Sequence, residues 1–315
     1  MCLVFMFPGQ SSRCIGMLDQ IRSRFGGASK ILSDASDVLG RDLVAHYAQD
    51  RDCYATNRDI QVALFLTSYL HAQWLASEGI VPKLSLGLSL GEYNHLVDIG
   101  AIQFVDALRL VDIRGCLYDR GPSGMMAAVA PIALSDLSRI MDEVAYLGVA
   151  DIANFNSPTQ YVISGLREPV MAALDALEED LYVQGIVIED SIPMHSRAFA
   201  PVAGALRPYL DSADWLQPVR PYIANVVGRI VSDPNPATIA ELLERHVYSP
   251  VLWSRSLEEV AEQHPAAVFV EVGPRSVLCN IIGRRWLANR KLKTDCGGED
   301  ITEMLRELSM LSASE

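Results

Sequence analysis

The sequence predicts an α/β protein, with an α/β-hydrolase-like large subdomain built on a parallel sheet and an inserted ferredoxin-like small subdomain. Residues 2–7 form a fully apolar run, as expected of a strand that a parallel sheet buries on both faces, and the mostly apolar segments 83–88 and 267–272 are further strand candidates. Between residues 122 and 192 the pattern becomes strand, helix, strand, strand, helix, strand. That order is typical of the split ferredoxin-like unit.

A linker-like sequence and a change in the order of predicted strands and helices indicate where the subdomain boundaries lie. Gly121-Pro122-Ser123-Gly124 reads as a connection between two folding units. We predict that residues 1–121 and 193–295 form the large subdomain, residues 122–192 the small one, and residues 296–315 a C-terminal tail. Amphipathic helices are expected at 59–78, 103–120 and 276–288.

Charge and cysteine content exclude several functional classes. The 26 Lys and Arg against 39 Asp and Glu give a net charge of −13, which argues against a nucleic-acid partner. No apolar run approaches the roughly 20 residues that a membrane span needs. The six cysteines are scattered, and no His, Cys or carboxylate spacing indicates a metal site. A cytoplasmic protein without a membrane or metal is therefore expected.

The segment Gly87-Leu88-Ser89-Leu90-Gly91 has the Gly-x-Ser-x-Gly spacing of a nucleophile elbow. It lies between a predicted strand and a predicted helix, which is the context that the motif requires. The helix would direct its free N–H groups at the serine hydroxyl, where an oxyanion could be stabilised. The same spacing also arises by chance, so Ser89 needs a base to count as a nucleophile.

Six histidines are candidates for that base, and His195 is the best placed. It follows a predicted strand and the helix breaker Pro193, at the point where the chain re-enters the large subdomain. His95 lies about two helical turns beyond Ser89 and should point away from it. The other four histidines lie in or beside amphipathic helices, where a surface position is expected: His46, His71, His246 and His264.

Beyond these residues, the chain resembles the malonyl-CoA:acyl carrier protein transacylases and the free-standing, trans-acting acyltransferases of polyketide synthases. The resemblance runs from residue 5 to about residue 285, over several motifs in the same order. The matching segments are Phe7-Pro8-Gly9-Gln10, Gln61 before Ala63-Leu64-Phe65, Gly87-Leu88-Ser89-Leu90-Gly91-Glu92, Ile113-Arg114-Gly115, Asn154-Phe155-Asn156-Ser157-Pro158 with Gln160, Met194-His195-Ser196, Asn225-Val226, Ser249-Pro250-Val251-Leu252-Trp253 and Glu271-Val272-Gly273-Pro274.

The resemblance implies a Ser-His mechanism of acyl transfer. Ser89 would attack the thioester of an acyl-CoA, and His195 would accept its proton. The backbone carbonyl of Leu252 would orient the histidine ring. The backbone N–H groups of Gln10 and Leu90 would form the oxyanion hole.

The resemblance also implies the substrates. Arg114 would hold the carboxylate of malonyl-CoA through a charge-assisted pair, with Gln61 beside it. The acceptor would be the phosphopantetheine thiol of an acyl carrier protein in polyketide or fatty acid synthesis, and no bound cofactor is implied. Met194 occupies a position that influences acyl choice in the family, and methionine is flexible enough to admit other groups.

Three alternatives stay open at this point. The same serine and histidine would serve an editing hydrolase that cleaves acyl groups from carrier proteins, or a transferase of a bulkier, uncharged acyl unit. A non-catalytic docking subunit fits poorly with an intact Ser89, His195 and Gln10. The dense basic stretch formed by Arg284, Arg285, Arg290, Lys291 and Lys293 is a candidate contact for the carrier protein or the CoA phosphates, or else a solvated helix face.

Overall fold

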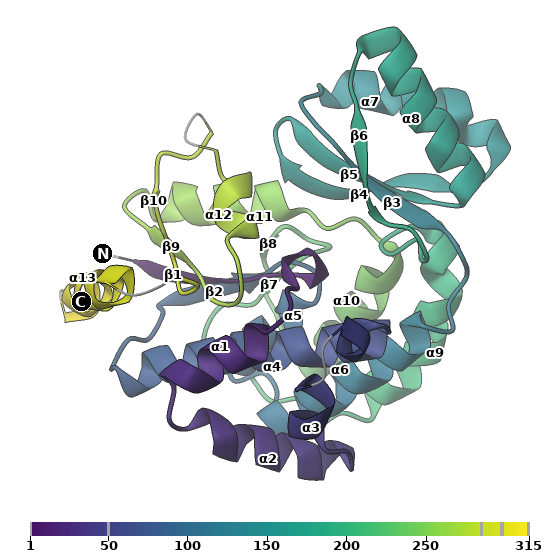
Figure 1. The fold of residues 1–315 in the computed structure, drawn as a ribbon. Helices are drawn as coiled ribbons and strands as arrows, with labels where there is room; N and C mark the ends of the chain where they lie inside the picture. The colour runs from purple at the N-terminus through teal and green to yellow at the C-terminus, as the bar shows by residue number, and fades with distance from the viewer. Residues whose placement is uncertain (1, 49–50, 284–285, 297–298, 314–315) are drawn as a thin grey trace. The chain divides into compact units, whose positions relative to one another are not determined.

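The computed structural model describes residues 2–48, 51–283, 286–296 and 299–313, and the chain divides into two compact units (Figure 1). Unit 1 comprises Met1–Asp119, Ala213–Ile223 and Val260–Glu315, and unit 2 comprises Arg120–Ser212 and Ala224–Glu259. The division differs from the predicted boundaries, because residues 193–212 and 224–259 group with unit 2. The reason is packing: helix α9 (Ala200–Asp211) lies against α10 (Pro236–Tyr248), and the short helix η4 (Arg197–Phe199) contacts strand β4 (Ala150–Ser157).

Unit 1 contains a four-stranded parallel sheet in the order β10 (Arg290–Lys293), β9 (Val268–Glu271), β1 (Leu3–Phe7) and β2 (Leu84–Gly87). All five residues of the central strand β1 are buried, as its unbroken apolar run requires. The α/β class and the parallel sheet are therefore confirmed.

Helices surround this sheet in Figure 1, and α4 packs against α6 beside it. The Thr56 hydroxyl caps the start of α4 by accepting a hydrogen bond from the Asp59 N–H. The helices of unit 1 are η1 (Gln10–Ser12), α1 (Met17–Arg24), α2 (Ala28–Leu39), α3 (Leu43–Tyr47), η2 (Arg51–Tyr54), α4 (Asn57–Ser77), α5 (Gly91–Asp98), α6 (Phe104–Tyr118), α12 (Val277–Ile281) and α13 (Glu299–Ala313).

The C-terminal part of unit 1 differs from the prediction. The helix expected at 276–288 is only α12, and the basic stretch contributes Arg290, Lys291 and Lys293 to the edge strand β10 instead of a helix face. Arg284 and Arg285 lie outside the described residues. The predicted tail contains α13, whose Met304 and Leu308 are buried, so hydrophobic packing holds this segment in unit 1.

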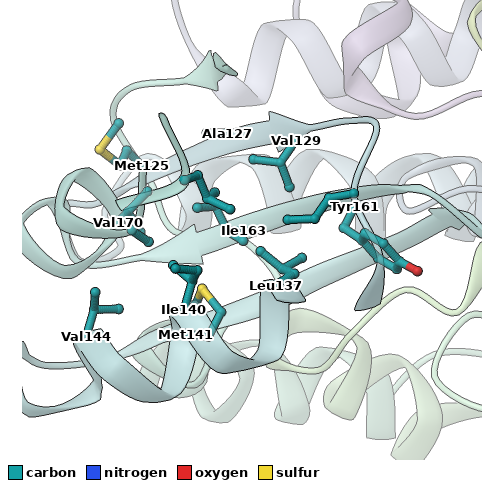
Figure 2. Packing of buried hydrophobic residues seen from close by; sticks show 13 residues of the cluster. Met125, Ala127, Val129, Leu137, Ile140, Met141, Val144, Tyr161, Ile163 and Val170 are labelled. Atoms are coloured by element: carbon teal, nitrogen blue, oxygen red, sulfur yellow. The ribbon is translucent and has the colours of Figure 1, made fainter. Parts of the chain in front are cut away.

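The antiparallel sheet of unit 2 confirms the ferredoxin-like prediction. The chain runs β3 (Met125–Val129), α7 (Leu134–Val144), β4, β5 (Gln160–Gly165), α8 (Arg167–Leu181) and β6 (Gly185–Glu189), and the sheet order is β4-β5-β3-β6. Figure 2 shows side chains of α7, among them Leu137, Ile140 and Val144, pointing at the strands. Because successive side chains of a strand point to opposite faces, every second residue of β3 meets this core.

The remaining described elements lie mostly after the small sheet. They are η3 (Ala145–Leu147), η4, α9, the two-stranded ribbon of β7 (Ile223–Ala224) and β8 (Arg229–Ile230), α10 and α11 (Trp253–Gln263). None of the helices in the described ranges combines the length and the hydrophobicity that a membrane crossing needs.

Two histidines expected at the surface are buried instead. His71 and His246 each have an exposed fraction of only 2%. His71 lies on α4 with its ring 6.3 Å from that of Trp74, and burial lowers its pKa from 6.5 to about 3. A helix that is apolar almost all round hides its occasional polar residue together with its neighbours, so helical spacing alone misplaced His71.

We expect His71→Leu to flatten the pH dependence of stability. Because the folded protein holds His71 neutral down to about pH 3, the unfolded chain binds one more proton between there and 6.5. The neutral His71 therefore makes its full contribution to the free energy of unfolding above pH 6.5. Below that pH the free energy of unfolding falls, by up to about 1.4 kcal/mol per pH unit. Urea titrations of both proteins at several pH values measure this slope. Equal slopes in the two proteins would contradict the assignment.

Candidate active site

Ser89 occupies a sharp turn between β2 and α5. Its φ of 52° lies in the left-handed region, which costs a residue with a side chain about 1 kcal/mol or more. The two flanking glycines make the turn possible. A Cβ on Gly87 would lie 2.0 Å from the Gly91 carbonyl, and one on Gly91 would lie 2.1 Å from the Phe7 carbonyl oxygen. Any side chain at these two positions would force the elbow apart.

The two residues predicted to donate to an oxyanion, Gln10 and Leu90, lie on two segments beside this turn. Leu90 is the N-cap of α5, so its N–H precedes the first helical turn and has no intrahelical acceptor. Gly9 lies against the elbow, since a Cβ there would be 2.9 Å from the Leu88 carbonyl oxygen and 3.5 Å from the Ser89 Cβ. Gln10, the next residue, is the first residue of η1, so its N–H likewise has no acceptor within that helix. The chain therefore brings Gln10 and Leu90 to the same neighbourhood as Ser89.

Arg114 is buried, with an exposed fraction of 2%. Its guanidinium lies 4.2 Å from the centre of the Tyr118 ring and 5.7 Å from that of Tyr93. Its Nη1 donates a 2.6 Å hydrogen bond to the Gln61 side-chain oxygen. Within the described part of the chain, no carboxylate forms an ion pair with Arg114. A buried cation held by aromatic rings and an amide is set up to receive an anion.

Gln61 connects this cation to the side chain of Gln10. Its Nε2 donates to the Oε1 of Gln10 across 3.4 Å, and both glutamines are buried. The structure therefore joins Gln10, Gln61 and Arg114 in one polar cluster of unit 1. The aromatic support of Tyr118 was missed at the sequence level, although its spacing of four residues from Arg114 on one helix was a usable signal.

His195 lies in unit 2 and is also strained, with a φ of 60°. Its backbone N–H donates to the Val247 carbonyl at 3.1 Å, and its Nδ1 lies 2.7 Å from the His246 carbonyl oxygen. Since a carbonyl only accepts, Nδ1 carries the proton and Nε2 is the basic nitrogen. Both carbonyls are at the C-terminal end of α10, where intrahelical donors run out and the helix dipole stabilises a positive charge.

The prediction that the Leu252 carbonyl orients this ring was wrong. Leu252 immediately precedes α11, and its carbonyl accepts from the N–H of Ser256 at 3.1 Å and from the Ser256 hydroxyl at 3.2 Å. A carbonyl at a helix start is used by the first helical turn, whereas one at a helix end is available to a neighbour. His246, in the last turn of α10, takes the role instead.

The His246 side chain adds a second buried imidazole to this part of unit 2. Its ring is stacked on that of His195, with centres 4.9 Å apart and planes inclined by 25°. Met194, which precedes His195, is buried as well. Sequence reasoning missed His246, although its position three residues before Ser249-Pro250 places it in the last turn of a helix.

His95 is engaged within unit 1. Its Nε2 accepts from the Ile223 N–H at 3.1 Å, so the proton lies on Nδ1, 2.8 Å from the Ser85 hydroxyl. Ser85 in turn donates to Asp98 at 2.6 Å. Both ring nitrogens are thus committed, as expected for a histidine that takes no part in chemistry. Among the described residues, no cluster of three or more His, Cys, Asp or Glu side chains could hold a metal ion.

Comparison with known proteins identifies relatives along almost the whole chain. Residues 4–294 match the acyl transferase domain family. The malonyl CoA-acyl carrier protein transacylase of Bacillus subtilis (strain 168) is 32% identical over 297 residues, which cover 93% of this chain and 92% of that protein. The Escherichia coli (strain K12) protein of the same name is 34% identical over 286 residues, covering 89% and 91%.

Solved structures agree with the fold described above. FabD from Acinetobacter baumannii superposes with a TM-score of 0.90 at 30% identity, covering 98% of each chain. The malonyl-transacylase PlMCAT, solved in complex with the type II PKS acyl-carrier protein AntF, superposes with a TM-score of 0.90 at 29% identity. The match covers 98% of this chain and 100% of that chain.

Proposed function

The chain belongs to the acyl transferase domain family, and from this we propose that it moves a malonyl group from CoA to the phosphopantetheine thiol of an acyl carrier protein. The reaction would serve fatty acid or polyketide synthesis. Arg114 carries the proposal, because it is buried, forms no ion pair with a described carboxylate and contacts Gln61. A malonyl thioester presents a carboxylate at one end and an electrophilic carbonyl at the other, so it would satisfy Arg114 and reach a nucleophile together.

The first half of the reaction would acylate Ser89. Its hydroxyl oxygen bonds to the thioester carbon while the proton passes to Nε2 of His195. The N–H groups of Gln10 and Leu90 donate to the oxyanion of the tetrahedral intermediate. The carbon–sulfur bond then breaks, and His195 returns the proton to the departing CoA thiolate.

The second half would be the reverse with a different thiol. The carrier protein's phosphopantetheine sulfur attacks the ester carbonyl after His195 takes its proton. The ester bond to Ser89 breaks, and the serine oxygen recovers the proton. Because each half uses the same groups, neither step needs a bound cofactor.

The choice of acyl group would depend on Arg114 and on the residues that line the acyl site with it. Arg114 and Gln61 would select the malonyl carboxylate, while the buried Met194 would set the room available at the α carbon. We place the reaction in the cytoplasm, since scattered cysteines without paired spacing favour a reducing compartment.

Intact-mass analysis after incubation with a panel of acyl-CoAs tests the function. We expect a malonyl adduct in preference to acetyl or bulky uncharged adducts, because those groups lack the carboxylate that Arg114 would bind. Addition of a phosphopantetheinylated carrier protein should move the adduct to that protein. Loss of the adduct to water at the same rate with and without the carrier would instead establish a hydrolase. Preferential loading of an uncharged, bulky acyl group would remove malonyl as the substrate.

A further inference from the structure

The polar cluster around Arg114 continues beyond Gln10 to a carboxylate. The Gln10 Nε2 donates to the Oδ1 of Asn57 at 2.7 Å, and the Asn57 Nδ2 donates to Asp119 at 3.0 Å. Together with the bonds from Arg114 to Gln61 and from Gln61 to Gln10, this makes an unbroken chain of four hydrogen bonds. The three amide side chains have exposed fractions of 9% or less.

The two ends of this series of hydrogen bonds, Arg114 and Asp119, determine the orientation of every amide side chain between them. Arg114 can only donate, and an ionised Asp119 can only accept. Gln61 must therefore present oxygen to Arg114, and Asn57 must present its NH₂ to Asp119. Gln10, between them, has to accept through Oε1 and donate through Nε2. The chain thus has one donor direction from the cation to the anion, and each amide dipole supports the next.

Asp119 is itself held firmly at the start of α4. It accepts from the backbone N–H of Asn57 at 2.7 Å and from that of Arg58 at 3.1 Å. These are orphan donors of the first helical turn, where a negative charge is stabilised. The carboxylate therefore gives the amide chain a rigid end that lies 62 residues away in sequence from the helix start it caps.

We propose that Asn57 and Asp119 are positioning residues for acylation, acting through Gln10. The inference rests on the proposed function, in which the Gln10 N–H is an oxyanion donor. By fixing both ends of the Gln10 amide, the chain fixes the backbone of a short loop that has only three residues of 3-10 helix to hold it. A donor displaced by a fraction of an ångström loses much of its effect on a developing oxyanion.

Asn57→Ala tests the proposal, since it removes both amide bonds and leaves the Asp119 contacts with the α4 backbone. We expect the rate constant for malonyl transfer to Ser89 to fall roughly ten- to a hundredfold, with little change in KM, because an oxyanion contact forms only in the transition state. The rate of labelling by an uncharged fluorophosphonate probe should fall by a similar factor. In that reaction the serine oxygen bonds to phosphorus, its proton passes to His195 and fluoride leaves. Because the probe has no carboxylate, Arg114 takes no part.

Thr56→Ala is the matched control. It removes the N-cap of α4 one residue away and costs about 1 kcal/mol of stability, but it leaves the amide chain intact. We expect it to keep the wild-type labelling rate. Asp119→Asn should slow labelling as Asn57→Ala does, because its new NH₂ would face an N–H donor of α4.

Three results would overturn the proposal: wild-type labelling by Asn57→Ala, wild-type labelling by Asp119→Asn, or an equal slowing in Thr56→Ala. Failure of the proposed function is distinguishable from each of them. A wild-type protein that reacts with the probe but takes up no malonyl group would contradict malonyl transfer. The ratio of labelling rates between Asn57→Ala and wild type would still decide whether the amide chain positions Gln10.

Discussion

Ser89→Ala is expected to abolish formation of the acyl-enzyme. The elbow presents one hydroxyl on a backbone that the flanking glycines hold in the left-handed region. Alanine keeps that backbone and removes the proposed nucleophile, so neither a covalent adduct nor a burst of free CoA should appear. Intact mass after incubation with malonyl-CoA reads the adduct directly, and a thiol reagent follows CoA release.

Ser85→Ala provides the control for Ser89→Ala. Ser85 is buried and links the His95 ring to Asp98, so its loss should lower stability by about 1–3 kcal/mol through unsatisfied polar groups. It should still form the adduct at close to the wild-type rate. A stable acyl adduct on Ser89→Ala would contradict the role of Ser89 as the nucleophile, whatever the behaviour of the control.

Arg114→Ala is expected to separate malonyl from acetyl transfer. Losing a buried charge-assisted pair should cost about 2–4 kcal/mol of transition-state binding, equivalent to a roughly 30- to 900-fold fall in kcat/KM for malonyl-CoA. Acetyl-CoA has no carboxylate and should lose little. Competition between the two thioesters, read by intact mass, measures the change in preference.

Arg109→Ala is the matched variant for this experiment. It lies on the same helix α6, but it is exposed and its partner is the half-buried Asp106 one turn away. A surface pair of this kind contributes at most about 1 kcal/mol, so both thioesters should react as in the wild type. Equal losses of malonyl and acetyl transfer in Arg114→Ala would show that the arginine supports the fold and binds no carboxylate.

The sequence was most informative where backbone geometry restricts the residue type. Gly87 and Gly91 must lack side chains, so their spacing around Ser89 predicted the elbow that is present. The unbroken apolar run of β1 likewise predicted a parallel sheet, because both faces of this strand are buried. The ferredoxin-like order of unit 2 was readable for the same reason, since each of its elements has its own hydrophobic period.

Features that depend on contacts between residues far apart in the sequence could not be predicted from the sequence. Asn57 and Asp119 have no local pattern that pairs them, and only the packing of α4 on α6 brings them together. Strand β10 was missed because a basic edge strand lacks the apolar run of a central one. The carbonyl that orients His195 was assigned to the wrong residue because every residue has a carbonyl, and helix ends decide which of them is available.

The two main-chain bonds that hold His195 bear on how this protein tolerates mutation. Since Val247 and His246 contribute carbonyl oxygens, substitutions at either position leave those acceptors in place. The length of α10 is constrained instead, because deleting one residue rotates its last turn by about 100° and carries both acceptors away. The last turn of α10 can therefore tolerate substitutions but not deletions. Percentage sequence identity counts substitutions and does not report this constraint on length.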